Sequence, residues 1–189
     1  MNKFFRIFLC LFAGLSANTS HADWYFEFGG GKDSGDEIDI RVYEEGGDSE
    51  TESVSLGGGI YFAFGGFQQL TNNWGLQYTF GYKVDDVTAT EQQVKFSRYP
   101  VNLLAVYQLG ESIQIAGGVT REFSPDLNLN DVGGENLAAE DATGAVAQIG
   151  YLAGPSGGIF LRHTRIEYDF GGPEMGRGNN TSLHIAFWW

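Results

Sequence analysis

The chain is 189 residues long and strongly acidic, with a formal net charge of −13. Acidic residues outnumber basic ones 24 to 11, and this balance argues against nucleic-acid binding, because phosphates need Lys and Arg to neutralise them. The length fits one domain. The 28 glycines and the aromatic content of 15% favour many strands joined by tight turns.

The first 22 residues have the features of a secretory signal peptide. Lys3 and Arg6 give a basic start, residues 7–17 are almost entirely apolar, and residues 20–22 offer a small-x-small cleavage pattern. The apolar run is too short to span a bilayer, so we predict its removal and a mature domain of residues 23–189. The single cysteine, Cys10, lies inside this segment, and the mature domain is therefore predicted to contain no disulfide.

Along the mature domain, large apolar side chains recur at every second position. The pattern is clearest over residues 74–84, where Trp74 and Phe80 alternate with Gln77. A period of two places alternate side chains on opposite faces of a β-strand. We predict strands at residues 24–30, 53–64, 74–84, 94–109, 113–121, 144–153, 158–168 and 181–189. Pro100 predicts a bulge or weak pairing in the fourth of these strands, and no segment has helical spacing.

The predicted connections alternate in length. Three are comparatively short, at residues 65–73, 110–111 and 154–157, whereas four are longer and polar, at residues 31–52, 85–93, 122–143 and 169–180. Short turns at one end and long loops at the other are typical of transmembrane barrels, with the long loops outside the cell. The loops at residues 31–52 and 122–143 are rich in carboxylates.

The two strand faces differ in a way that decides between soluble and membrane barrels. One face collects Trp, Phe, Tyr, Leu and Ile, and the other collects Gly, Ser, Thr and Gln, which make a poor hydrophobic core but suit a crowded polar lumen. The pattern predicts an all-β fold, a closed eight-stranded antiparallel up-and-down transmembrane β-barrel. A soluble lipocalin-like ligand-binding barrel remains the alternative. In such a barrel the large apolar side chains would point inward and the polar ones would face water.

The last strand carries the most specific signal in the sequence. Leu183, Ile185, Phe187 and Trp189 share one face, and the chain stops on the aromatic. This pattern resembles the C-terminal signal that the barrel assembly machinery reads. The chain as a whole, including the turn at residues 65–75, resembles the small eight-stranded outer-membrane barrels: OmpA-like transmembrane domains, OmpX-like proteins and opacity-type surface proteins. The resemblance implies an outer-membrane protein with both termini periplasmic, but it does not define a role.

Three polar side chains on the lumen face are predicted to meet. Glu27, Arg162 and His184 lie at similar depth on the first, seventh and eighth strands, which are neighbours in a closed barrel. An unpaired charge would be costly in so narrow a space, so we expect a buried Glu27–Arg162 pair with His184 nearby. Separate solvated groups are the alternative. Lys83 and Arg98 are expected to pair with loop carboxylates nearer the outer rim.

His163 and Arg165 fall on the lipid-facing side, near the outer leaflet. Their spacing partly resembles the His-x-Ser pair of the lipid A deacylases, with Glu174 following, but Arg165 occupies the serine position and leaves no nucleophile. We therefore predict a lipopolysaccharide contact through Arg165 and His163, since Arg suits phosphate oxygens. A lipid A-modifying enzyme remains the alternative function.

The sequence thus predicts a non-enzymatic, monomeric outer-membrane protein that serves envelope integrity or surface interaction. Its expected partners are outer-membrane lipid, lipopolysaccharide and the assembly machinery. No cofactor and no metal are predicted. Asp126 begins a calcium-loop-like pattern, but Asp131 stands where the turn glycine belongs and Leu137 stands at the twelfth position.

Overall fold

The computed structural model describes residues 22–33, 38–43, 49–54, 56, 58–89, 92–129, 136–171 and 176–189. The predicted signal peptide lies almost wholly outside these residues, and its cleavage stays a prediction. Most side chains of the acidic stretch at 31–52 also lie outside the described part. Among the residues that the structure describes, no helix is long and apolar enough to cross a membrane.

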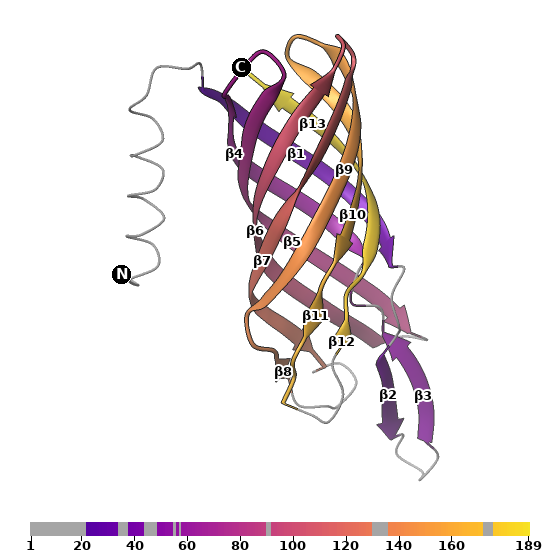
Figure 1. Ribbon diagram of the computed structural model, residues 1–189. Helices are drawn as coiled ribbons and strands as arrows, with labels where there is room; N and C mark the ends of the chain where they lie inside the picture. The colour runs from indigo at the N-terminus through magenta and orange to yellow at the C-terminus, as the bar shows by residue number, and fades with distance from the viewer. Residues whose placement is uncertain are drawn as a thin grey trace.

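The described elements are all strands, and eight of them close into a barrel (Figure 1). Around the ring the order is β1-β4-β5-β6-β7-β9-β10-β13, with β13 returning to β1, and every pairing is antiparallel. The predicted fold class is therefore confirmed. The barrel strands are β1 (Ala22–Asp33), β4 (Gly59–Gln69), β5 (Trp74–Ala89), β6 (Gln92–Leu109), β7 (Ile113–Asn128), β9 (Ala142–Gly154), β10 (Gly157–Arg165) and β13 (Asn180–Trp188).

Five shorter strands lie outside the ring. They are β2 (Ile38–Tyr43), β3 (Ser49–Val54), β8 (Leu137–Ala138), β11 (Glu167–Tyr168) and β12 (Gly176–Arg177). β2 pairs with β3, β11 pairs with β12, and β8 adds to the end of β7. All five lie at one end of the barrel, which we call the loop end (Figure 1).

The opposite end, the turn end, carries the tight turns and the last residue of the chain. Backbone hydrogen bonds tie the turns to neighbouring strands there, from Gln108 N to Asn73 O and from Leu152 N to Ser112 O. Trp24 and Trp189 exchange two backbone hydrogen bonds at the same end, of 3.0 and 3.2 Å. The last residue therefore continues the pairing of β13 with β1.

Several predicted strand ends were wrong, in most cases because pairing continues further than the local pattern indicates. β4 begins at Gly59 and ends at Gln69, so it is shifted relative to the predicted 53–64 and takes up part of the predicted turn. β5 and β6 extend through most of the predicted loop at 85–93, since their ladder runs to Ala89↔Gln92. β7 likewise continues into the predicted loop at 122–143 and ends at Asn128.

Two further expectations concern single strands. The predicted seventh strand is divided, because β10 ends at Arg165 and β11 pairs with β12 instead of continuing the barrel. An irregularity does occur near Pro100. Two residues of β7, Ser124 and Pro125, stand opposite the single residue Arg98, and Ser124 has a φ of 47°. This extra residue in β7 is a β-bulge.

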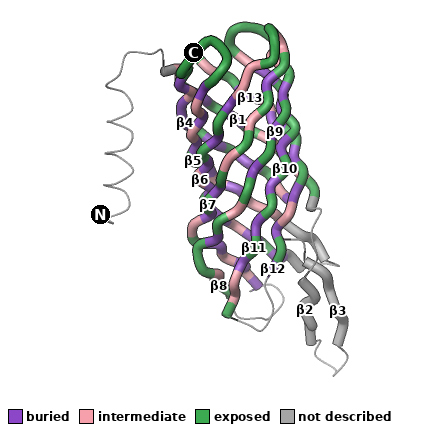
Figure 2. The backbone as a smooth tube through the Cα atoms, viewed as in Figure 1, coloured by how far each residue is buried: buried purple, intermediate pink, exposed green. Residues whose placement is uncertain are grey.

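Inside and outside residues alternate along the barrel strands (Figure 2). On β1, Tyr25 and Glu27 are buried while Trp24, Phe26 and Phe28 are exposed. The same holds for most of the ring, where the exposed large apolar side chains include Phe62, Phe64, Trp74, Phe80, Leu103, Ile115, Val119, Ile149, Leu161, Leu183 and Phe187. A surface of this size has no favourable contact with water and fits the hydrocarbon core of a bilayer.

The side of the barrel wall predicted for Leu56 is wrong. The two-residue alternation of the predicted strand at 53–64 places Leu56 on the outer face with Ile60 and Phe62, but Leu56 is fully buried and packs with Val94, Phe96 and Leu127. Leu56 precedes β4 and does not share its alternation.

The polarity of the barrel reverses at the loop end. Ile166 and Tyr168 are buried inside, whereas Arg165 and Glu167 are exposed. An apolar interior under a polar surface is the arrangement expected in water. The rest of the barrel, toward the turn end, has a polar interior and an apolar surface, which is the arrangement expected in lipid. The boundary between the two runs near Arg165.

A charged plug in the lumen as the candidate functional site

A buried ion pair between β1 and β10 lies inside the barrel. Arg162 binds Glu27 with both ends of its guanidinium group, Nη1 to Oε1 at 2.7 Å and Nη2 to Oε2 at 2.9 Å. Glu27 has no exposed side-chain surface and Arg162 has almost none. Bidentate geometry of this kind gives the strongest carboxylate–guanidinium contact.

Two neighbours satisfy the remaining polar atoms of the pair. Gln148 Oε1 accepts hydrogen bonds from Arg162 Nε at 2.9 Å and from Nη2 at 2.7 Å. The Tyr25 hydroxyl donates to Glu27 Oε2 at 3.0 Å. Tyr61 also lies near the guanidinium, with Arg162 Cζ 5.6 Å from its ring centroid. These partners limit the desolvation cost of the buried charges.

Sheet register explains why residues so distant in sequence meet. On β13, Ala186 stands opposite Glu27 and Ser182 stands opposite Arg162, so the long Arg side chain crosses β13 diagonally to reach the carboxylate. Gly29 makes room for the neighbouring imidazole, because a Cβ there would lie 2.7 Å from His184 Nδ1. The strand pairing therefore determines the site as much as the residue types do.

His184 completes a chain of polar groups. Its Nε2 lies 2.7 Å from Ser182 Oγ, and its Nδ1 lies 3.8 Å from Glu27 Oε1. The structure thus places the carboxylate of Glu27 beside this histidine. The order Ser–His–Glu matches that of a hydrolase triad, but Arg162 already binds both Glu27 oxygens.

Little free space remains around these side chains. The cavity beside them has a volume of about 20 Å³. Its lining residues include Tyr61, Lys83, Asn102, Ser182 and His184. Such a volume holds about one water molecule. A substrate therefore has no room beside Ser182, and these groups act as a plug.

A second buried pair lies nearer the loop end. Arg98 Nε is 3.1 Å from Glu122 Oε2, in a geometry too bent for a hydrogen bond, and Nη2 donates to Gly58 O at 3.3 Å. The Tyr168 hydroxyl donates to the same Glu122 oxygen. The Arg98 guanidinium also lies 4.3 Å from the Phe96 ring centroid. Arg98 thus meets a carboxylate, although Glu122 belongs to β7 and not to a loop.

Sequence reasoning missed Tyr25, Gln148 and Glu122 as members of this lumen network. Tyr25 and Gln148 share the lumen parity of their strands, which places them inside the barrel but does not single them out as partners of the ion pair. Glu122 was assigned to a loop because the predicted strand stopped at Arg121. Extending the alternation Thr120, Glu122 by one step would have placed it inside.

The predicted lipopolysaccharide contacts lie on the outer face, as their parity indicates. His163 and Arg165 are both exposed, and His163 Nδ1 lies 3.1 Å from Thr181 Oγ1. Thr181 stands opposite both His163 and Lys32 in the ladder, so Lys32, Thr181 and His163 form one row across β1, β13 and β10. In the described part of the chain, no carboxylate forms an ion pair with His163 or Arg165.

The four residues of the predicted C-terminal assembly signal lie on the last strand. Three of them are exposed on the outer face, Leu183, Phe187 and Trp189, and Ile185 is half-buried.

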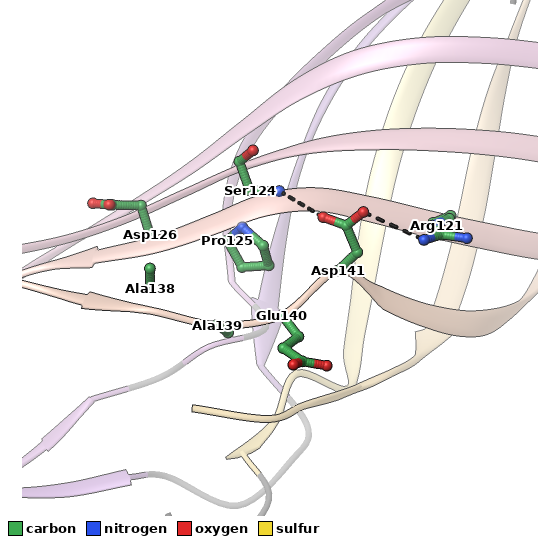
Figure 3. A pocket seen from close by; sticks show the side chains of 8 residues that line it. All are labelled: Arg121, Ser124, Pro125, Asp126, Ala138, Ala139, Glu140 and Asp141. Carbon is green, nitrogen blue, oxygen red and sulfur yellow. Dashed lines mark hydrogen bonds and ion pairs between the residues drawn. The ribbon is translucent and has the colours of Figure 1, made fainter. Parts of the chain in front are cut away.

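A separate hollow of about 550 Å³ lies beside the bulge of β7 at the loop end (Figure 3). Asp141 links its walls, accepting from Ser124 N at 3.3 Å and from Arg121 Nη2 at 3.3 Å. Asp126 and Glu140 also line it. The described residues contain no group of His, Cys, Asp and Glu side chains that could hold a metal ion. Asp141 thus stabilises the strained Ser124, and the hollow has no metal-binding geometry.

The closed ring, the apolar outer band and the charged plug define the class: this chain has the fold of the small eight-stranded outer-membrane β-barrel proteins. Solved structures agree. The chain is 13% identical to Ail, the attachment invasion locus protein of Yersinia pestis, with a TM-score of 0.54 and coverage of 89% of this chain and 97% of Ail. A second Ail structure, in complex with the heparin analogue sucrose octasulfate, gives 13% identity, a TM-score of 0.51 and coverage of 88% and 96%.

Similarity to OprG of Pseudomonas aeruginosa is lower, with 13% identity, a TM-score of 0.47 and coverage of 90% of this chain and 97% of OprG. No family model matches the chain. No curated protein matches it either. At these identities the likeness concerns the fold and carries no activity from one protein to another.

Proposed function

We propose that this chain is a non-enzymatic integral outer-membrane protein whose loop end faces the outside of the cell and acts in envelope integrity or surface interaction. The reversal of polarity near Arg165 carries the proposal. A band with apolar residues outside suits lipid, and the extension with apolar residues inside suits water beyond the membrane surface. The barrel is proposed to be a monomer that the assembly machinery inserts.

The plugged lumen supports a role without catalysis or wide passage. The triad-like groups Ser182, His184 and Glu27 are buried, with about 20 Å³ of free space beside them. On the outer face, Arg165 stands two residues after His163, at the position where a lipid A deacylase has its nucleophilic serine. The polyanion bound by Ail is not proposed as a ligand here, because residues 31–52 are rich in carboxylates and would repel it.

Orientation is tested by labelling single engineered cysteines in intact cells with a membrane-impermeant maleimide. Glu140→Cys lies at the loop end and Ser156→Cys lies in the β9–β10 turn, and both residues are exposed. The Glu140→Cys variant is expected to react in intact cells, and the Ser156→Cys variant only after the outer membrane is permeabilised. The reverse result would overturn the proposed orientation. The unmodified chain, whose one cysteine is Cys10, is the control.

Lipopolysaccharide contact is proposed for Arg165, supported by His163 and Lys32 nearby on the outer face. Arg165→Ala is expected to weaken lipopolysaccharide binding to the purified barrel by about tenfold or more, since a hydrogen bond to a charged group contributes about 1.5–3 kcal/mol. Binding is measured by titration of lipopolysaccharide into barrels in phospholipid nanodiscs. Arg121→Ala is the matched control, because Arg121 is exposed but already paired with Asp141. An equal loss in both variants would refute a specific contact.

A further inference from the structure

The turn end of the lumen contains a second cavity, which we call the turn-end pocket. Its volume is about 330 Å³, and it lies on the opposite side of the plug from the loop end. Four glutamines line it, one on each of four neighbouring strands. They are Gln69 on β4, Gln77 on β5, Gln108 on β6 and Gln114 on β7. They form an amide wall.

Aromatic side chains form the facing wall. Tyr25 and Trp188 are register partners on β1 and β13, and their rings are nearly parallel, 6.2 Å apart at an interplanar angle of 4°. Phe67 also lines the pocket, from β4 where that strand pairs with β1. The strands that carry the glutamines and those that carry Tyr25 and Trp188 are separate segments of the ring. One side of the pocket thus offers amides and the other offers aromatic rings.

One amide in this pocket lacks a partner. Gln77 is 1% exposed, and its Nε2 has no hydrogen-bond partner among the described residues. A buried donor without an acceptor is unfavourable, and native structures satisfy nearly all such groups with protein, water or ligand. Gln77 Nε2 therefore lacks an acceptor, and Gln77 lines a pocket in which a water molecule or a ligand could supply one.

The lining limits what that acceptor belongs to. Asp23 and Glu111 are the charged residues that line the pocket, and no Lys, Arg or His lines it. Anionic ligands are disfavoured by this charge. Amides both donate and accept, which matches hydroxyl groups, while the C–H faces of a sugar ring pack against aromatic rings. The volume lies at the lower end of the range for small-molecule sites, about 300–1,000 Å³.

We propose that the turn-end pocket binds an uncharged mono- or disaccharide, with Gln77 Nε2 donating to a sugar oxygen and Trp188 contacting the sugar ring. In the proposed orientation the pocket opens to the periplasm, so its glycan would come from that compartment. That placement rests on the proposed function, whereas saccharide binding by the purified barrel does not. Failure of one is therefore distinguishable from failure of the other.

The test uses the folded chain in phospholipid nanodiscs, prepared without maltoside or glucoside detergents, whose headgroups would occupy the pocket. Maltose and N,N′-diacetylchitobiose are titrated while ¹H–¹⁵N spectra follow the side-chain amides of Gln77 and Gln114 and the Trp188 indole. Saturable shifts at these groups are expected with at least one probe. Glucuronate is expected to bind at least tenfold more weakly than the neutral sugars.

Variants separate a built site from a pocket that holds only water. Gln77→Leu and Gln114→Leu are each expected to raise the Kd at least tenfold, and retained heat-modifiable migration on a gel shows that each barrel still folds. Gln93→Leu makes the same change at the far end of β6 and is expected to leave the Kd unchanged. Absence of saturable shifts for both neutral sugars, or equal weakening by Gln93→Leu, would overturn the proposal in favour of water alone.

Discussion

Replacing Arg162 by alanine is expected to lower the free energy of unfolding by about 3–5 kcal/mol, because the change leaves a buried carboxylate without its partner. Glu27 is fully buried and receives both guanidinium hydrogen bonds, at 2.7 and 2.9 Å. Only the Tyr25 hydroxyl, with the more distant His184, would then remain beside it. Urea titration of barrels in phospholipid vesicles, followed by heat-modifiable migration, measures the loss.

Two comparisons show whether the pairing itself is responsible. Arg121→Ala removes an exposed ion pair with Asp141 and is expected to cost about 0–1 kcal/mol. The double variant Glu27→Leu/Arg162→Met is expected to recover most of the stability, because apolar side chains of similar volume replace both charges. If the double variant is as unstable as Arg162→Ala, the loss comes from packing and the uncompensated charge is not its cause.

Placing an arginine on the outer face at mid-height is expected to cost about 2–4 kcal/mol in a bilayer. Phe28 is the chosen position, since it is 40% exposed and lies on β1 midway between Trp24 and Lys32. The free energy of unfolding of Phe28→Arg in vesicles provides the measurement. A charge at this depth loses its hydration to hydrocarbon, which is the source of the cost.

The matched control for this experiment is Thr181→Arg. Thr181 is exposed and stands opposite Lys32 in the ladder, so it lies where the outer face already carries a charge. The expected cost there is about 0–1 kcal/mol. Equal and small costs at both positions would contradict the membrane band and favour the soluble barrel, whose outer face meets water.

The lumen network shows how far sequence reasoning reaches into a barrel. Glu27 and Arg162 could be placed at one depth because both follow strand parity and the ring makes their strands near neighbours. Gln148 and Tyr25 have the same parity, yet nothing local separates them from the other inward polar residues. Their selection depends on the diagonal reach of Arg162 across Ala186, which is a property of the register.

The amino-acid sequence by itself determined the number of barrel strands and the alternation of inward and outward residues within them, because a two-residue period is a local property of each strand. Only the tertiary structure decided where β5, β6 and β7 end, since those ends depend on whether a partner strand is still beside them. It also decided that Glu122 enters the lumen and that Leu56 joins an apolar core at the loop end. Both outcomes depend on pairing and packing between segments that are distant in the sequence, and a local periodicity does not predict such contacts.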